Sequence, residues 1–251
     1  PHYFLGSNAD LPIVAAPSSR TTTPGRRYTF AMAKAPIEKT YTFPGFENIK
    51  VGRVKWPMST IRLQGEDREE LADLAEKILG AWRKYSDPSV EILAETDATA
   101  QHDHADARRA QRLELDHACV RNNRTTKEHP LGLFHPHAEV HHIKKENIGL
   151  IEVMGLAVLP ARLKKEMALL GAELVKGTPD ISGMPEIASH ADWYKMLREK
   201  YPEVSQENVE GILQEEIGKV FEIVLTHAGV YKRDAKGMEA FDRFVATAAE
   251  D

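Results

Sequence analysis

The sequence lacks several features that extracellular, membrane and nucleic-acid-binding proteins usually carry. Its 251 residues include one cysteine, Cys119, so no disulfide can form within the chain, and a cytoplasmic location is expected. No apolar run is long enough to span a membrane, and no basic segment followed by an apolar one marks a signal peptide. The formal net charge of −5 argues against a general nucleic-acid binder, although it leaves room for a local basic pocket.

The composition that remains is that of an ordinary globular protein. Hydrophobic residues make up 42% of the chain and charged residues 28%, and no internal repeat or low-complexity segment interrupts it. A chain of this length can bury one large core or two small ones. We therefore expect a folded protein whose partners include neither nucleic acid nor a membrane.

Hydrophobic periodicity predicts a sheet followed by helices. Segments with alternating or β-branched character are expected to form strands: several within 40–64, then 90–95, 113–116, 138–143 and a buried one within 148–159. Apolar residues at helical spacing predict helices at 66–85, at 160–174 and from 190 to 249, with a Gly- and Pro-rich loop at 177–185. This order predicts an α+β fold with an antiparallel sheet.

The densest polar stretch of the chain lies between Phe134 and Glu152. Five of the eleven histidines fall between His129 and His142, and two lysines follow directly. Imidazole and ammonium groups at this density suit a phosphorylated ligand, but an exposed polar strand explains the same composition. If the stretch is a strand, adjacent side chains point to opposite faces, so only one of His141 and His142 faces a given pocket.

The amino-acid sequence of this region resembles that of a known protein family. Residues 121–163, which include Phe134-His-Pro-His-Ala-Glu-Val-His-His-Ile-Lys-Lys-Glu-Asn-Ile-Gly-Leu-Ile-Glu152, resemble the bacterial (type 2) galactose-1-phosphate uridylyltransferases. Two more blocks look similar to that family, 1–14 and 28–36 onward to Thr96-Asp97. Members of the family are about twice this length, so the resemblance implies that the chain, which opens at Pro1, is roughly a C-terminal half.

The resemblance also implies a fold and an activity. The expected architecture is an antiparallel α+β domain related to the histidine-triad fold over 1–175, followed by a helical C-terminal region over 176–251. The implied reaction moves UMP from UDP-glucose to galactose 1-phosphate through a uridylyl-histidine intermediate, with no cofactor required. UDP-glucose, UDP-galactose and hexose 1-phosphates are the implied partners, and a homodimer is an arrangement that the resemblance allows.

The histidine block that should supply the nucleophile is absent. Where the family has Gly-Gly-Ser-Ile-Leu-Ser-His-Asp-His, the chain has Ala15-Ala-Pro-Ser-Ser-Arg-Thr-Thr-Thr23, so Thr21 and Thr23 stand at the two histidine positions. A threonine hydroxyl with no base beside it cannot replace an imidazole. With GC-rich codons and one base dropped, the family block translates into these nine residues, which suggests a frame-shifted reading of 15–27.

A second departure from the family lies within 98–112 and has the same explanation. A shifted reading of the family's sequence yields Ala100-Gln-His-Asp-His-Ala-Asp106. His102 and His104 therefore mimic the missing His-x-His motif, and metal ligation is the other interpretation of this pair. We expect neither role for them, because their neighbours match an out-of-frame sequence.

By resemblance, the substrate site includes the region from Arg121 to Glu152 and two residues before the nucleophile block. The candidate substrate-binding residues are Asn8, Asp10, Arg121, Asn123, Arg124, His135, His137, His141, Lys145, Asn147 and Glu152. No catalytic residue and no metal ligand is assigned. The sequence as it stands also fits a catalytically inactive nucleotide-sugar-binding protein, or a structural subunit that assembles through its helical tail.

Several of these residues have alternative interpretations. Asn8 and Asp10 are expected at the sugar or ribose, and the two arginines at phosphate or uracil, although a solvated turn would also explain the arginines. Lys145 is favoured over Lys144 for phosphate. Glu152 is expected to accept a hexose hydroxyl, or else to form a buried structural pair.

A divalent metal is a further possibility for the histidine cluster at His135–His142. On an extended chain His135 and His137 share one face, as do His137 and His141, and such a set could hold zinc. A positively charged anion pocket explains the same residues without a fourth ligand.

Overall fold

The computed structural model describes residues 29–94, 101–103, 116–122 and 124–250. Their contacts group into two compact units. The sheet unit comprises the described residues up to His135, together with Asn147–Leu156 and those from Leu225 onward. The helical unit comprises Pro136–Glu146 and Ala157–Val224.

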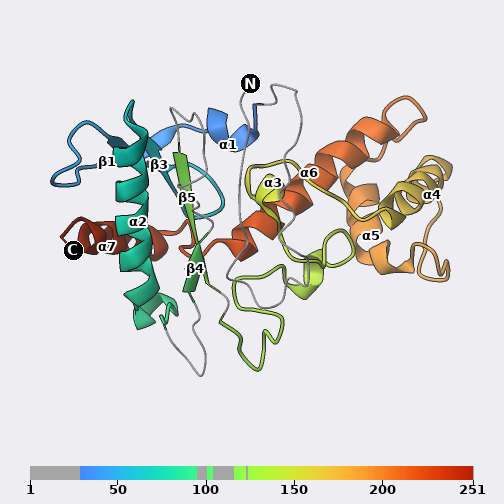
Figure 1. Ribbon diagram of the computed structural model, residues 1–251. Coiled ribbons are helices and arrows are strands. Elements are labelled where there is room, and N and C mark those ends of the chain that lie inside the picture. Colours follow the sequence, from blue (N-terminus) through green and yellow to red (C-terminus); the bar gives the residue numbers. More distant parts are fainter. Residues whose placement is uncertain (1–28, 95–100, 104–115, 123, 251) are drawn as a thin grey trace. The chain divides into compact units, whose positions relative to one another are not determined.

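The sheet unit is built on an antiparallel sheet. Its strands are β1 (Ile37–Tyr41), β2 (Lys50–Val54), β3 (Thr60–Gln64), β4 (Gln101–Asp103) and β5 (Asp116–Asn122), in the order β1-β2-β3-β5-β4 (Figure 1). Every neighbouring pair is antiparallel. The predicted strands within 40–64 and the antiparallel α+β class are confirmed, and the strand predicted at 113–116 reaches the described residues only at Asp116, where β5 begins.

Helix α2 (Arg68–Lys84) covers one face of this sheet. The carboxylate of Asp67 accepts hydrogen bonds from the backbone N–H groups of Glu69 and Glu70 at 2.8 and 3.3 Å, which starts the helix as an N-cap does. Its apolar stripe is buried on the sheet together with helix α7 (Ala235–Glu250). The shared core includes Val51, Ile61, Leu63, Leu71, Leu74, Ile78, Trp82, Val120, Phe241 and Phe244.

Three strand predictions are wrong, because local hydrogen bonds favour turns there. Residues 138–143 form a 3-10 turn (η3, Ala138–Val140) and further turns, with the Val140 N–H bound to the carbonyl of His137. Within 148–159 the chain forms the short helix α3 (Leu150–Val153), because the Glu152 carboxylate accepts from the Gly149 N–H at 2.7 Å. Within 90–95, η1 (Pro88–Val90) is followed by a single bridge from Ile92 to Asp87.

Trp56 and Gly155 show why the chain turns after α3. Gly155 has a φ of +96°, and a Cβ built there would lie 2.9 Å from the indole of Trp56. The Trp56 indole N–H donates to the carbonyl of Val153 at 2.9 Å. Glycine is therefore required at this position both by its backbone conformation and by the close approach of the ring.

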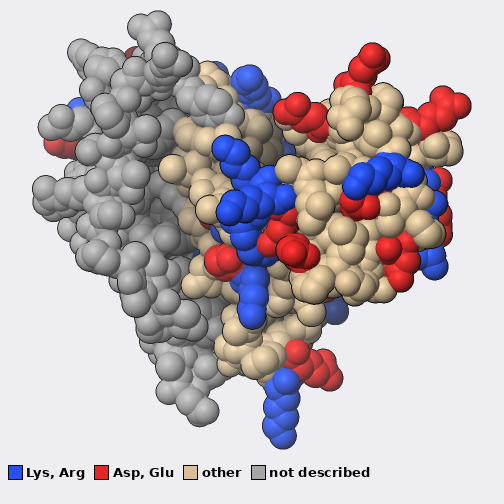
Figure 2. All heavy atoms as spheres, turned by 90° about the vertical axis from the view of Figure 1, so that its right-hand side faces the viewer, with Lys and Arg blue, Asp and Glu red and all other residues tan. Residues whose placement is uncertain are grey.

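The helical unit consists of helices, the loop between α4 and η4, and the segment Pro136–Glu146. It contains α4 (Arg162–Lys176), η4 (Ala188–His190), α5 (Ala191–Lys200) and residues 209–224 of α6 (Val209–Ala228). The helices predicted at 160–174 and from 190 onward are confirmed, as is the intervening loop. Figure 2 shows side chains of both charge signs mixed across the described surface in that view.

The contacts group helix α7 with the sheet unit. Helix α7 packs into the core of the sheet unit, whereas the expected boundary at 175/176 places it in a separate helical region. The division into two domains, 1–175 and 176–251, stays a prediction. None of the described helices has the length and apolar character that crossing a bilayer requires.

Candidate functional site

The face of the sheet opposite α2 carries polar side chains. In β3, Ile61 and Leu63 point into the core, so the intervening Arg62 points to the other face. Arg62 pairs in register with His117 of β5. Its Nε–H donates to His117 Nε2 at 2.9 Å, and a terminal nitrogen donates to the carbonyl of Met32 at 2.8 Å.

The contact between Arg62 and His117 fixes the protonation of the imidazole. Because Nε2 of His117 accepts a hydrogen bond, it carries no proton. Burial, with the neighbouring Arg62 charge second, lowers the pKa of His117 to about 4. Burial likewise lowers the pKa of Arg62. The pair is thus a neutral imidazole beside a buried cation.

Arg121 is the predicted site residue whose surroundings best suit an anion. It follows His117 and Cys119 at alternate positions of β5, so all three share the face that carries Arg62. Arg121 is 8% exposed, and burial lowers its pKa. Among the described residues, one of its terminal nitrogens has no hydrogen-bond partner. A buried guanidinium with an unused donor can bind a phosphate or carboxylate oxygen.

Other predicted residues of the sheet unit contact the protein itself. Arg124 donates to the carbonyl of Glu91 at 2.8 Å, so it is anchored rather than fully solvated. Nε2 of His135 lies 2.9 Å from Oδ1 of Asn147. Glu152 is 5% exposed and accepts a backbone hydrogen bond through one oxygen, an arrangement that suits its structural interpretation as well as a hydroxyl contact.

The remaining predicted residues belong to the helical unit. His137 is half-buried, His141 Nε2 lies 2.9 Å from the carbonyl oxygen of Pro136, and Lys145 is exposed. Lys144, which was not favoured, is buried, and its ammonium donates to the carbonyl of Val158 at 3.4 Å. Since residues 138–143 are not a strand, the expected alternation of side chains does not apply here.

One hydrogen bond determines which nitrogen of His141 is available to a metal. A carbonyl oxygen only accepts hydrogen bonds, so the Nε2 of His141 that lies against Pro136 must carry the proton. A protonated nitrogen cannot ligate a metal, which leaves only Nδ1 of His141 for that role. The arrangement of this side chain therefore does not support a zinc site through Nε2.

Four residues of the helical unit that the sequence did not pair, three of them buried or half-buried and Arg162 exposed, lie together. Nδ1 of His142 lies 2.9 Å from Nδ1 of His190, and Nε2 of His190 lies 2.9 Å from the carboxylate of Glu166. Arg162 donates to that carboxylate at 2.6 Å. His142 lay in the histidine-rich stretch, but no pattern in the sequence pairs it with a residue 48 positions away.

Arg62 and His117 were also missed. The sequence offered one signal, an arginine between two apolar residues of a predicted strand. That signal does not indicate that His117 is its partner. Residues Asn8, Asp10 and Asn123, and the nucleophile positions Thr21 and Thr23, lie outside the described residues, as does His104.

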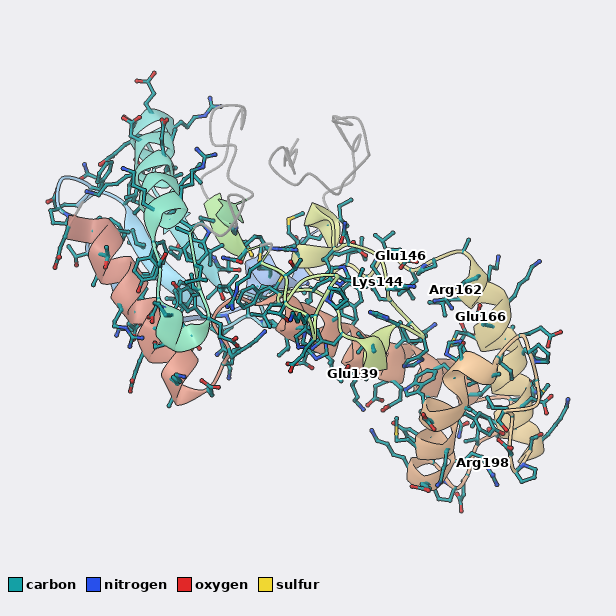
Figure 3. The ribbon with its side chains drawn as sticks, turned by 90° about the horizontal axis from the view of Figure 1, so that it is seen from below. Glu139, Lys144, Glu146, Arg162, Glu166 and Arg198 are labelled. Carbon is teal, nitrogen blue, oxygen red and sulfur yellow. The ribbon has the colours of Figure 1, made fainter. Side chains whose placement is uncertain are left out.

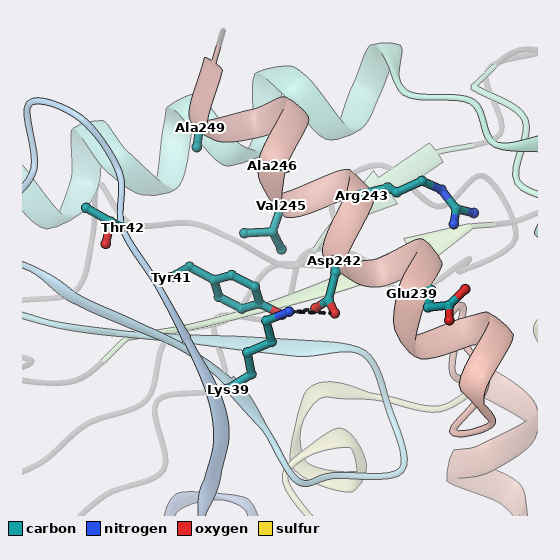
Figure 4. Close-up of a pocket in the computed structure, with 9 residues that line it drawn as sticks. All are labelled: Lys39, Tyr41, Thr42, Glu239, Asp242, Arg243, Val245, Ala246 and Ala249. Carbon is teal, nitrogen blue, oxygen red and sulfur yellow. Dashed lines mark hydrogen bonds and ion pairs between the residues drawn. The ribbon is translucent and has the colours of Figure 1, made fainter.

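A surface groove in the sheet unit offers space but unsuitable chemistry for a nucleotide sugar. Figure 4 shows it with its lining residues: Lys39, Tyr41, Thr42, Glu239, Asp242, Arg243, Val245, Ala246 and Ala249. Its volume of about 670 Å³ would admit such a ligand. However, Lys39 is paired with Asp242 at 2.8 Å and Arg243 with Asp87 at 2.7 Å, so its cations are already neutralised. It also contains none of the predicted site residues.

Comparison with known proteins points to one family. The model for "Galactose-1-phosphate uridyl transferase, C-terminal domain" matches residues 2–195. A galactose-1-phosphate uridylyltransferase of Clostridium acetobutylicum is 53% identical over 248 residues, which are 98% of this chain and 50% of that protein. Proteins of the same name from Halalkalibacterium halodurans and Ligilactobacillus salivarius are each 50% identical, over 98% of this chain and 49% of their own length.

The matches cover only part of each related protein. The chain spans about half the length of the curated relatives it matches. No solved structure gave a significant match.

Proposed function

Since this chain belongs to the galactose-1-phosphate uridyl transferase family, matching its C-terminal domain, we propose that it forms the C-terminal half of a UDP-glucose–hexose-1-phosphate uridylyltransferase. The observation that carries the proposal is the identity of about half of all positions, sustained over 98% of the chain, to proteins of that name. In the proposed cytoplasmic reaction, UMP moves from UDP-glucose to galactose 1-phosphate.

The proposed chemistry is a double displacement on phosphorus. A histidine nitrogen attacks the α-phosphorus of UDP-glucose, the bond to the glucose 1-phosphate oxygen breaks, and a uridylyl-histidine forms. A phosphate oxygen of galactose 1-phosphate then attacks the same phosphorus, the P–N bond breaks, and UDP-galactose leaves. Both steps need cationic donors that hold the phosphate oxygens.

Arg121 is the residue of this chain that we assign to that electrostatic role. Its buried guanidinium has an unused donor among the described residues and can bind a phosphate oxygen without first giving up a partner there. Arg62 instead holds His117 and the Met32 carbonyl, so we assign it to maintaining the polar face. The histidine-triad relationship of the sheet belongs to the same proposal.

The nucleophile determines whether this molecule turns over. With Thr21 and Thr23 at the histidine positions, the chain has no imidazole to accept UMP there. A catalytically inactive nucleotide-sugar-binding protein is therefore the second candidate function, and this substitution is the observation that favours it.

Two measurements on the purified protein separate the candidates. Peptide mass mapping of residues 1–34 shows whether the block reads Gly-Gly-Ser-Ile-Leu-Ser-His-Asp-His or Ala15 to Thr23. Nuclear magnetic resonance then follows UDP-galactose formation from UDP-glucose and galactose 1-phosphate. The histidine block with turnover supports the transferase. The threonine block with UDP-glucose binding but no turnover supports the inactive binder, and no binding at all contradicts both and favours a structural subunit.

The homodimer and the divalent metal remain predictions. Light scattering after gel filtration measures the mass of the particle in solution and tests the first. Metal analysis of protein purified without chelators tests the second.

A further inference from the structure

The segment Pro136–Glu146 of the helical unit carries three of the predicted substrate-binding residues, His137, His141 and Lys145. Four backbone hydrogen bonds between His137 and Lys144 shape its local turns, but they do not attach it to the rest of the helical unit. Side chains from α4 and η4 make that attachment. Figure 3 labels residues of the segment, Glu139, Lys144 and Glu146, together with Arg162 and Glu166 of α4.

A chain of hydrogen bonds ties His142 of the segment to helix α4. Nδ1 of His142 lies 2.9 Å from Nδ1 of His190, and Nε2 of His190 lies 2.9 Å from Oε2 of Glu166. His190 is fully buried. The Trp193 ring packs against both imidazoles, with centroids 5.3 Å from His142 and 6.2 Å from His190. The middle of this series of hydrogen bonds, at His190, is thus shielded from water.

The acceptors define where the protons lie. The carboxylate of Glu166 accepts, so His190 carries a proton on Nε2. A neutral His190 then has a bare Nδ1, and the bond between the two Nδ1 atoms requires His142 to donate. His142 is therefore the tautomer with its proton on Nδ1, which fixes the orientation of its ring.

Arg162 strengthens this attachment from the same helix. One terminal nitrogen donates to Oε2 of Glu166 at 2.6 Å and to the carbonyl of His142 at 3.2 Å. The other donates to the carbonyl of His141 at 3.4 Å. A single guanidinium thus orients the carboxylate and grips the backbone of the segment.

We propose that His190, Glu166 and Arg162 are positioning residues that hold the segment Pro136–Glu146, through His142, in the conformation that binds hexose 1-phosphate. We refer to these four side chains as the histidine anchor. The inference rests on the proposed function, because it takes His137, His141 and Lys145 as substrate contacts. None of the four anchor residues needs to touch the substrate.

The test compares two substitutions of His142 in the full chain. In His142→Asn, the side-chain amide N–H can take the place of Nδ1–H and preserve the bond to His190. His142→Leu keeps an apolar body but removes the donor. Arg198→Ala is the matched control, because Arg198 of α5 also donates to a backbone carbonyl, that of Pro179, but does not hold the segment (Figure 3).

Two readouts are measured on each variant. Hydrogen–deuterium exchange with mass spectrometry reports the protection of the segment without requiring activity. Calorimetric titration with galactose 1-phosphate reports binding, and thermal unfolding shows that each variant is folded. His142→Leu should speed exchange in 138–146 about 10-fold and weaken galactose 1-phosphate binding about 10-fold, the effect of losing one good hydrogen bond. His142→Asn and Arg198→Ala should stay within about 2-fold of the unaltered protein in both readouts.

The outcomes test the histidine anchor and the proposed substrate separately. Unchanged exchange in folded His142→Leu would overturn the anchor. Faster exchange with unchanged galactose 1-phosphate affinity would show that the anchor holds the segment but does not position a substrate site, which also overturns the inference. If the unaltered protein does not bind galactose 1-phosphate, the proposed substrate is wrong, whereas exchange still shows whether the anchor holds the segment.

Discussion

The two units bury a histidine near an arginine in opposite ways. In the sheet unit, Nε2 of His117 accepts directly from Arg62, so a cation and an imidazole share one hydrogen bond. In the helical unit, the carboxylate of Glu166 accepts from both His190 and Arg162. The first arrangement requires an unprotonated nitrogen on the histidine, and the second requires a protonated one.

This difference determines how each site responds to acid. A proton added to His117 would place a second positive charge against Arg62 at hydrogen-bond distance. A proton added to His190 would instead stand beside Glu166, which raises the pKa of that imidazole against the larger lowering caused by burial. His117 should therefore be harder to protonate in the folded protein than His190.

Acidification should produce the largest effect. The pKa of His117 in the fold is about 4, below its ordinary value of 6.5, so the unfolded chain binds the extra proton first. The contribution of unprotonated His117 to the free energy of unfolding is complete above pH of about 6.5. As the pH falls toward 4, the free energy of unfolding drops by roughly 3 kcal/mol. Urea unfolding between pH 7.5 and 4 measures it.

His117→Gln is the control for that measurement. Its amide oxygen can accept from Arg62 but does not titrate, so this variant should lose much less stability on acidification. An equally steep pH dependence in His117→Gln would assign the effect to other groups. His142→Asn gives the corresponding control in the helical unit, where burial and the neighbouring His190 lower the pKa of His142 to about 4.

Glycines with positive φ test the same contrast in the backbone. Gly155 of the sheet unit has φ +96° and lies against Trp56, whereas Gly177 of the helical unit has φ +71° and open space around it. Gly155→Ala should cost about 3 kcal/mol, from backbone strain and overpacking, and Gly177→Ala about 1 kcal/mol from strain alone. Equal changes in the free energy of unfolding would remove the packing argument at Gly155.

The two arginines should differ by less. Arg62→Met leaves the Nε2 of His117 and the Met32 carbonyl without their donor in a buried site, at a cost of about 2 kcal/mol. Arg162→Met should cost about 1 kcal/mol, because the Arg162 side chain is 39% exposed and water can take its place. Denaturant midpoints compare the two variants, and a larger loss from Arg162→Met would reverse the ranking of the sites.

The smallest effects are expected at exposed ion pairs. Lys39 of the sheet unit pairs with Asp242, which also accepts from Arg53 and Tyr41. Lys219 of the helical unit pairs with the exposed Glu215 and with the buried Glu216, which keeps Lys200 and Tyr201 as donors when Lys219 is replaced. Both lysine side chains are nearly half exposed, and solvent screens such pairs. Neither Lys39→Gln nor Lys219→Gln should shift the thermal midpoint measurably; a clear shift in one of them would identify a pair that does more than cover the surface.

The sequence was most informative where structure depends on local periodicity. The strands within 40–64, helix α2 and the helices after residue 160 all follow from hydrophobic spacing. Membership of the family was predicted from the amino-acid sequence of residues 121–163. Strand predictions at 138–143 and 148–159 failed because β-branched residues there are overridden by turn hydrogen bonds, such as that from Gly149 to Glu152.

By itself, then, the sequence determined the antiparallel class, most helices, the family, and the presence of threonines where that family has its nucleophile. Only the tertiary structure decided which polar groups pair. Arg62 meets His117 across 55 positions, and His142 meets His190 across 48. Periodicity records which face of an element is buried, but a hydrogen bond between elements depends on register and packing, which are set when the whole core assembles.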